Sequence, residues 1–355
     1  MKKILGFTFV RWGSLPWTEH SGTSDLILPL DTSKIPYYAG ATLETPAISL
    51  SYRDKSWKTW HLRKFAYGWA WIQGIKHKNV SPMARRHTSV IWAPFPMVMK
   101  YGTHINLSEA ASLRFIAANA SIPVPKVYCA VEHWGMKFIL MEAVRGKTLG
   151  EHWQTASASS RIHLRMKLKE QFEELRNIPH PRPGAVCSSD IGPLFDRRIE
   201  DDIRGIGPFA NEKDFSNFLR CGATGVEDIK DKATRFSSAA AQQEIPLMIG
   251  NQDKEGRKIC FTHGDAHSGN FLVRGQEIVA WIDVEFAGFL PEHWEYINAM
   301  SSNDEPWWKQ EIGFVLKQYP EELRAENARS TYFDDQIRAV LPREVGEMNV
   351  KVAPQ

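Results

Sequence analysis

The chain has 355 residues, of which 43% are hydrophobic and 24% charged, and its formal net charge is +3. This composition is typical of a globular protein with a packed core, and the length suits one large domain or two ordinary ones of roughly 150 residues. A net charge this small gives no reason to expect binding to nucleic acid or to a membrane surface, and we expect neither as a partner.

Cysteine usage and hydropathy indicate the compartment. The four cysteines are widely separated and form neither a metal-type pair nor a disulfide framework, which favours a reducing environment. No apolar run reaches the ~18 residues needed for a membrane span. The apolar stretch Ile4–Val10 is short and ends at Arg11, which argues against a secretion signal. The sequence therefore predicts a soluble, cytoplasmic protein.

The first 85 residues show little regular pattern. Six of the 13 tryptophans occur before residue 72, helical and strand periodicities are weak, and no internal repeat is visible. We expect residues 1–85 to be a divergent or poorly defined segment whose tryptophans fill a core rather than bind a ligand.

Residues 86–143 carry the pattern of a small β-rich lobe. "SVIWAPF" and "MVMKYG" predict two short strands separated by prolines, and residues 106–120 predict an amphipathic helix capped by Asn106 or Ser108. Two further strands follow, with a turn at Gly135 between them. The predicted order is strand, strand, helix, strand, strand.

Helical patterns dominate residues 144–340, and we expect a disordered tail over 341–355. The helix predicted at 160–177 carries an apolar stripe of Ile162, Met166, Leu168, Phe172 and Leu175. Further helices are expected to start at "DFSNFL", "EHWEYINAM" and "WWKQEIGFVLKQ". The predicted class is α+β, with a small β-rich N-terminal lobe joined to a larger, mainly helical C-terminal lobe.

One segment, "FTHGDAHSGN" at 261–270, concentrates groups that transfer protons or bind metals. It is followed by a strand, a turn and a second strand that ends at Asp283. A hairpin returns the chain beside its start, so we expect Asp265, Asn270 and Asp283 at one end of it. An aspartate can accept a proton from an attacking hydroxyl, and an amide oxygen with a second carboxylate suits Mg²⁺. This set is what phosphoryl transfer from a nucleotide requires.

The spacing strengthens this interpretation. His263 precedes Asp265 by two residues and Asn270 follows it by five, as in the protein-kinase catalytic loop H-R-D-x-x-x-x-N. Asp283 then takes the place of the aspartate of the kinase D-F-G motif. Upstream, Lys100 ends a strand and Glu109 lies in the first turn of the next helix. A strand lysine held by a helix glutamate can bind the α- and β-phosphates.

Five segments together resemble the aminoglycoside phosphotransferase/choline kinase family of small-molecule kinases, especially its fungal members. They are "VMKYGTHINLSEAASLRFIAANASIPVPKVY", "FILMEAVRGKTLGEHW", "IGPLFDRRI", "FTHGDAHSGNFLV" and "WIDVEFAGFLPEHWEY". The resemblance implies a two-lobed, protein-kinase-like fold with ATP in the cleft. It implies that Asp265 is the catalytic base and that Asn270 and Asp283 bind Mg²⁺. It also implies that Lys100, paired with Glu109, binds phosphate, and that the backbone around Glu142 and Val144 meets the adenine.

Three further residues are expected to support the site. His263 is predicted to brace the loop by a hydrogen bond, His267 to brace it or to touch substrate, and Glu285 to support the metal without binding it directly. Glu292 and Glu295 could line the acceptor side, but a solvated helix start is the interpretation we favour.

The sequence lacks one feature of kinases. No glycine-rich turn with G-x-G-x-x-G spacing precedes Lys100. The leading hypothesis is an ATP- and Mg²⁺-dependent phosphotransferase acting on a hydroxyl or amine of a small molecule, whose identity stays open. The alternatives are a catalytically inactive kinase-like binding module, a repurposed enzyme of natural-product metabolism that uses the same carboxylates for acid–base chemistry, and a zinc hydrolase built on His263, Asp265, His267 and Asp283.

Overall fold

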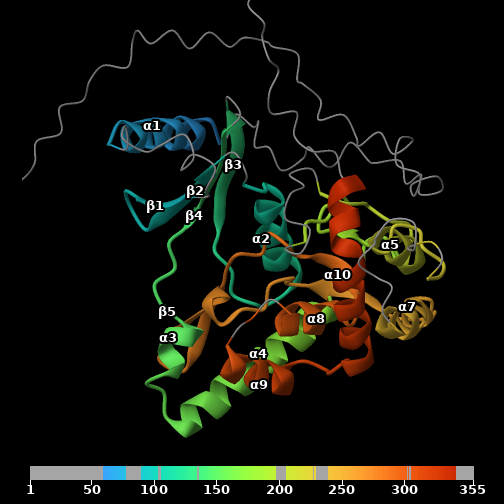
Figure 1. Ribbon diagram of the computed structural model, residues 1–355. Helices are drawn as coiled ribbons and strands as arrows, with labels where there is room; N and C mark the ends of the chain where they lie inside the picture. The colour runs from blue at the N-terminus through green and yellow to red at the C-terminus, as the bar shows by residue number, and fades with distance from the viewer. Residues whose placement is uncertain are drawn as a thin grey trace, which may run out of the picture.

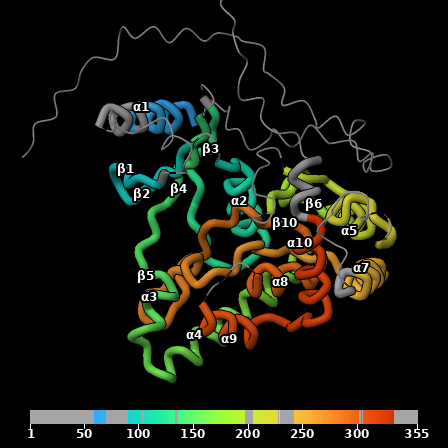
Figure 2. The backbone as a smooth tube through the Cα atoms, in the orientation of Figure 1, coloured from blue at the N-terminus to red at the C-terminus, as the bar shows by residue number. Residues whose placement is uncertain are grey.

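The computed structural model describes residues 59–76, 89–102, 105–133, 136–196, 205–226, 228, 239–301, 303 and 305–340. Within these residues a small lobe built on a four-stranded sheet lies beside a larger, mainly helical lobe (Figures 1 and 2). The predicted α+β class is confirmed. The predicted tail and most of the segment predicted to be poorly defined lie outside the described residues.

The sheet of the small lobe is antiparallel throughout. Its strands are β1 (Ser89–Ala93), β2 (Met97–Gly102), β3 (Val127–His133) and β4 (Met136–Glu142), in the order β1-β2-β4-β3. Pro94 and Pro96 occupy the turn between β1 and β2, because proline cannot donate to a strand ladder. The four strands predicted from the sequence are confirmed.

The two faces of this sheet pack on different helices. One face, with Met99 and Leu140, packs against Ala66 of α1 (Trp60–Lys76). The other, with Ile139, packs against Ala110 of α2 (Ser108–Asn119), the helix predicted from the sequence. The N-cap of α2 is Leu107, so the prediction of Asn106 or Ser108 at that position was wrong, although Asn106 Oδ1 accepts a hydrogen bond from the Ser108 amide at 2.9 Å. Helix α1 was not predicted, because its apolar residues have no clear helical period.

The large lobe contains helices, short strands and one 3₁₀ turn. In chain order they are β5 (Lys147–Thr148), α3 (Leu149–Trp153), α4 (Ala158–Arg176), β6 (Cys187–Ser188), α5 (Glu212–Leu219), α7 (Ala239–Gln252), β7 (Ile259–Thr262), η5 (Ser268–Asn270), β8 (Phe271–Arg274), β9 (Glu277–Trp281), β10 (Gly288–Pro291), α8 (Trp294–Ser301), α9 (Pro306–Val315) and α10 (Pro320–Val340). The predicted hairpin is β8–β9, and it pairs with β5.

A second small sheet determines which loops meet at the junction of the lobes. Its order is β6-β10-β7, and β10 is antiparallel to both neighbours. Strands β6 and β7 therefore run parallel to each other and end at the same edge, where β10 begins. The segments that follow Ser188 and Thr262 consequently emerge beside the segment 283–287, which leads into β10.

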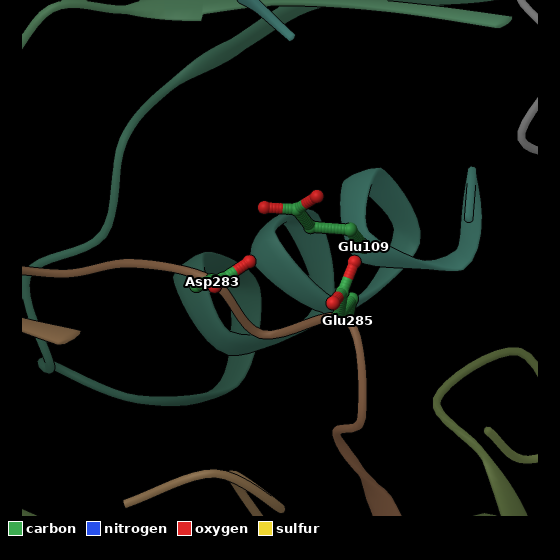
Figure 3. A group of neighbouring side chains, drawn as sticks. All are labelled: Glu109, Asp283 and Glu285. Carbon is green, nitrogen blue, oxygen red and sulfur yellow. The ribbon is translucent and has the colours of Figure 1, made fainter. Parts of the chain in front are cut away.

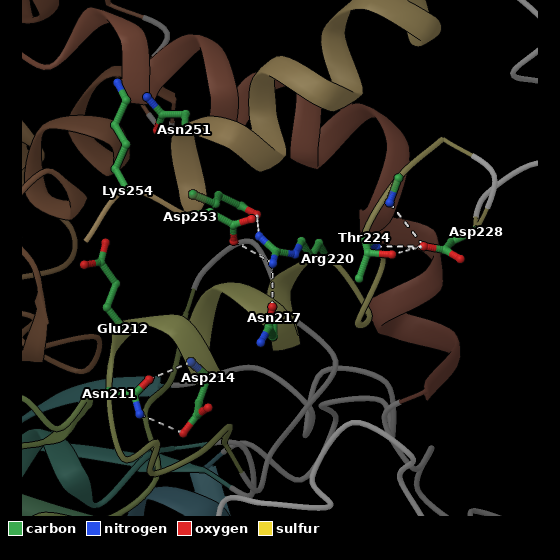
Figure 4. A network of polar contacts seen from close by, with 12 residues as sticks. Asn211, Glu212, Asp214, Asn217, Arg220, Thr224, Asp228, Asn251, Asp253 and Lys254 are labelled. Atoms are coloured by element: carbon green, nitrogen blue, oxygen red, sulfur yellow. Dashed lines mark hydrogen bonds and ion pairs between the residues drawn. The ribbon is translucent and has the colours of Figure 1, made fainter.

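The largest hydrophobic core of the large lobe lies behind this edge. Trp281 and Phe271 of the hairpin pack against Phe172 of α4, and all three side chains are buried. A polar contact joins α5 to the end of α7 in the same lobe (Figure 4). The buried guanidinium of Arg220 binds Asn217 at 2.6 Å and Asp253 at 2.8 Å.

The apolar stripe predicted for α4 was partly wrong. The buried apolar residues are Leu164, Leu168, Phe172 and Leu175, whereas Ile162 and Met166 are 56% and 51% exposed. At 3.6 residues per turn, positions 162 and 166 lie about half a turn away from 164 and 168, so they face solvent.

This assignment of faces can be tested on one helix. We expect Leu168→Ala to lower the free energy of unfolding by about 2–5 kcal/mol, because it leaves a cavity in the core. Met166→Ala should change it by no more than about 0.5 kcal/mol. Urea denaturation followed by circular dichroism measures both, and equal losses would contradict the assigned orientation of α4.

Candidate active site

The loop after β7 is built around a glycine that no other residue can replace without strain. Gly264 has φ = +82°, and a Cβ added there would lie 2.3 Å from the Phe286 carbonyl oxygen. Only glycine combines this backbone conformation with so close an approach. The His263–Asp265 segment therefore packs directly against the segment that carries Asp283 and Glu285.

Helix α8 holds this loop through a buried carboxylate. Glu295 is 1% exposed and accepts hydrogen bonds from the amides of His263 (2.6 Å to Oε2) and Gly264 (3.3 Å to Oε1). Asn298, one turn further along α8, donates to the Gly264 carbonyl at 3.0 Å. Burial raises the pKa of Glu295, although the hydrogen bonds from the His263 and Gly264 amides act in the opposite direction.

The expectation that Glu295 lies at a solvated helix start is therefore wrong. The buried face of α8 carries Glu295 and Asn298 at i and i+3, and both contact the loop. The sequence did contain a signal for this contact, namely two polar residues on the apolar face of the helix. Buried polar groups require hydrogen-bond partners, so these two residues indicate a contact with another part of the chain. Glu292 lies before α8, is half-buried, and accepts a hydrogen bond from the Tyr319 hydroxyl.

His263 connects the loop to the end of β9. Its Nδ1 accepts a hydrogen bond from the Asp265 amide at 3.2 Å, and its Nε2 lies 3.1 Å from the Ile282 carbonyl oxygen. This pattern requires the neutral ring to carry its proton on Nε2. His267 uses its Nδ1 to accept from the Gly269 amide at 3.0 Å. With both ring nitrogens of His263 engaged, the geometry gives no support to the zinc alternative.

Asp265 and Asn270 are in direct contact. Asn270 Nδ2 donates to the Asp265 carbonyl oxygen at 2.8 Å and to its Oδ2 at 3.1 Å. Both partners are acceptors, so the amide nitrogen of Asn270 must face Asp265 and its Oδ1 must point elsewhere. The Asn270 carbonyl accepts from the Ile282 amide at 2.9 Å, which brings Asn270 beside the residue preceding Asp283.

Lys100 and three carboxylates form the second part of the site. Lys100 Nζ lies 2.8 Å from Glu109 Oε2, 2.8 Å from Asp283 Oδ1 and 3.3 Å from Glu285 Oε2. Figure 3 shows that Glu109 projects from α2, whereas Asp283 and Glu285 come from the segment after β9. One oxygen of each carboxylate lies within 4.8 Å of the other two, and this is the one group with metal-ligand spacing in the part of the chain that the structure describes.

This cluster contains more carboxylates than ammonium groups. Burial raises the pKa of Glu109 to about 7, although Lys100 lowers it, and burial also raises the pKa of Glu285. Burial alone would lower the pKa of Lys100, but the three carboxylates outweigh it and raise that pKa. With all three carboxylates ionised, the four side chains would carry a net charge of −2, and a bound cation would favour that ionised state over the protonated one. The side chain of Asp283, which has φ = +59°, is 41% exposed and gives access from solvent.

The predicted site residues thus fall into two contacting groups and one separate segment. The Lys100–Glu109–Asp283–Glu285 cluster and the Asp265–Asn270 pair adjoin each other through the packing of Gly264 against Phe286. Glu142 and Val144 lie apart from both, where β4 leads into the large lobe. The amides of Glu142 and Ala143 donate to the carbonyls of Lys126 and Pro96, both at 2.9 Å.

Two further contacts of the loop were not anticipated from the sequence. The indole Nε1 of Trp308 donates to the Ala266 carbonyl at 2.8 Å, and the Ser268 hydroxyl donates to Glu305 at 3.1 Å. Both partners belong to α9 or its N-cap.

In the described ranges, no helix combines the length and apolar composition that crossing a bilayer would require.

The contacts of Glu295 predict a specific loss of stability. Glu295→Ala leaves two buried amides without an acceptor, and we expect a cost of about 1–3 kcal/mol for each. Glu295→Gln retains one acceptor oxygen and should be intermediate. Glu292→Ala, which removes the acceptor of one tyrosine hydroxyl, should cost about 1 kcal/mol. Urea denaturation gives the free energies, and faster amide exchange in the peptide around His263 should accompany only the Glu295 variants. Equal effects at positions 292 and 295 would contradict the role assigned to Glu295.

The chain is similar to several known proteins. An aminoglycoside 3'-phosphotransferase of Niallia circulans is 24% identical over 170 residues, which cover 48% of this chain and 55% of the relative, so the chain spans about half the length of that relative. A solved structure of a thermostable mutant of aminoglycoside phosphotransferase APH(4)-Ia with ADP and hygromycin B has 17% identity and a TM-score of 0.47, covering 72% of this chain and 86% of that one. The gentamicin complex of APH(2")-IIa has 12% identity and a TM-score of 0.41, covering 68% and 77%.

The family model described as the phosphotransferase enzyme family matches residues 106–329, which is more than half of the chain. The match includes Glu109, Asp265, Asn270 and Asp283, and it begins after Lys100. On the strength of this match, the chain belongs to the phosphotransferase enzyme family.

Proposed function

We propose that the protein transfers the γ-phosphoryl group of ATP, with Mg²⁺, to a hydroxyl or amine of a small molecule. The observation that carries the proposal is the contact of Asp265 with Asn270 in a loop packed against the Lys100–carboxylate cluster. Family membership supports it. The name of the Niallia circulans relative further suggests acceptors that carry several hydroxyls and amines.

Lys100 is the proposed ligand of the phosphates. It is buried, and Glu109 holds its ammonium from α2, so its position is fixed before a nucleotide arrives. A fixed cation stabilises developing charge at no cost of reorganisation during the reaction. The adenine would lie near Glu142 and Val144. Of the three amides in that segment, those of Glu142 and Ala143 are already hydrogen-bonded, which leaves the Val144 amide as the candidate donor.

The donor set fits Mg²⁺. The partly exposed carboxylate of Asp283 and the Oδ1 of Asn270, which points away from Asp265, are hard oxygen ligands of the type that Mg²⁺ prefers. Glu285, whose Oε2 lies 3.3 Å from Lys100 Nζ, would support them without binding the ion directly. When bound, the ion would neutralise part of the phosphate charge and thereby assist transfer.

Asp265 is the proposed catalytic base. Asn270 donates a hydrogen bond to its Oδ2 at 3.1 Å, which restrains the side chain. A carboxylate in this position can orient the acceptor and take its proton as the phosphoryl group is transferred. The four cysteines are all buried and none of them forms a disulfide, which suits the proposed cytoplasmic location.

The base assignment predicts a loss of turnover without a loss of nucleotide binding. We expect Asp265→Asn to lower the rate of phosphoryl transfer by about 10²–10⁴, while the affinity for Mg·ATP stays within a few-fold. Transfer from γ-labelled ATP to a panel of hydroxyl- and amine-bearing molecules, aminoglycosides included, measures the rate. Glu170→Gln, on the exposed face of α4, is the matched control. Transfer by the Asp265 variant at the wild-type rate would exclude this residue as the base.

A nucleotide-independent binding module is the second candidate, because no glycine-rich turn precedes Lys100. Thermal denaturation separates the two. A phosphotransferase should be stabilised by about 2.7 kcal/mol when Mg·ATP stands at 100 times its Kd. Lys100→Met should abolish this shift relative to its own unliganded midpoint, whereas Lys167→Met, on the exposed face of α4, should retain it. A wild-type protein that shows no shift with millimolar Mg·ATP would support the module instead.

A further inference from the structure

The ammonium of Lys100 is surrounded by three carboxylates. Its Nζ lies 2.8 Å from Glu109 Oε2, 2.8 Å from Asp283 Oδ1 and 3.3 Å from Glu285 Oε2. An ammonium carries three N–H donors, so these three acceptors match its donors in number. The lysine side chain is also only 8% exposed. A phosphate oxygen that binds this ammonium must therefore displace a carboxylate.

Exposure and distance indicate which carboxylate gives way. Glu109 is 1% exposed, so it is sheltered from a ligand that arrives from solvent, whereas the side chains of Asp283 and Glu285 are 41% and 25% exposed. Asp283 is already assigned to the metal ion in the proposed function. Glu285 makes the longest of the three contacts, and Coulomb attraction weakens with distance. Glu285 is therefore the carboxylate that a phosphate would displace.

The backbone of Glu285 is held in place on two sides. Glu285 lies in a turn that closes with a hydrogen bond from the Ala287 amide to the Val284 carbonyl at 3.1 Å. Asn106, which precedes α2, donates to the Glu285 carbonyl at 3.4 Å. These contacts keep the residue beside Lys100, so its carboxylate is available to the ammonium whenever no other ligand occupies that place.

We propose that Glu285 makes the nucleotide-free protein self-inhibited, because it occupies the Lys100 N–H group that a phosphate oxygen of the nucleotide takes over. This inference rests on the proposed function and adds a competition within its site. The nucleotide has to replace the carboxylate at the ammonium and to approach its negative charge. Removing Glu285 should therefore strengthen the binding of the phosphates, whereas the loss of a residue that only supports the site would weaken it.

The experiment measures ATP binding in EDTA, so that any effect of Glu285 on a metal ion does not enter. Isothermal titration gives the Kd. We expect Glu285→Ala, which frees the N–H group, to strengthen binding by about tenfold or more. Glu285→Gln keeps an acceptor oxygen without the charge and should give a smaller gain. Glu277→Gln removes an exposed carboxylate at the start of β9 and should leave the Kd unchanged.

A double-mutant cycle tests whether the gain depends on Lys100. In a Lys100→Met background there is no N–H group to free, so Glu285→Ala should give at most a small part of the gain seen in the wild-type background. A gain of the same size in both backgrounds would overturn the inference. Equal gains for Glu285→Ala and Glu285→Gln would also overturn it, because they would indicate repulsion by charge alone.

The outcomes separate this inference from the proposed function. If the wild-type protein binds Mg·ATP, but both Glu285 variants bind ATP in EDTA no better than the wild type, then only the self-inhibition is overturned. If the wild-type protein binds ATP neither with Mg²⁺ nor in EDTA, and Glu285→Ala does not restore binding, both proposals fail. Binding that appears only when Glu285 is removed would support the inference.

Discussion

The structure depends on the ion pairs of Lys100. Its ammonium, on a strand of the small lobe, binds Glu109 from α2 and also Asp283 and Glu285 from the large lobe. Buried charges are costly unless they are paired. The charged groups that the two lobes contribute at their junction therefore need one another as partners. The same pairing gathers three carboxylates around one cation, with one oxygen of each within 4.8 Å of the others, which is a spacing that could hold a metal ion.

The second constraint is the sheet β6-β10-β7, because its register decides which loops lie side by side. Strand β7 ends where β10 begins, so the loop of Asp265 emerges next to the segment of Asp283. Gly264 allows the two to approach closely, and Glu295 fixes the loop from behind by binding two of its amides. The loop that carries Asp265 and Asn270 and the segment that carries Asp283 thus belong to different parts of the chain that meet at one edge of a sheet. This arrangement holds both groups of side chains in position before a ligand binds, and it needs no direct contact between the side chains of the two groups.

Much of the site could be predicted because it is local in the chain. His263, Asp265 and Asn270 lie within eight residues, so their spacing is visible without a fold, and the strand–helix pattern around Lys100 and Glu109 is equally short. The braces could not be predicted in the same way. Glu295 reaches His263 across 32 positions and Trp308 reaches Ala266 across 42. Helix α1 was missed for a different reason, since its apolar residues follow no clear helical period.

The sequence by itself determined the fold class, the strands of the small lobe and the chemistry that the site can offer, because local periodicity and motif spacing survive without a partner. Tertiary structure alone decided the environment of each group. It buried Glu295 where a solvated position was expected and turned Ile162 and Met166 outward. The physical reason is that burial and register arise from packing between elements distant in the chain, and neither is encoded in the order of nearby residues.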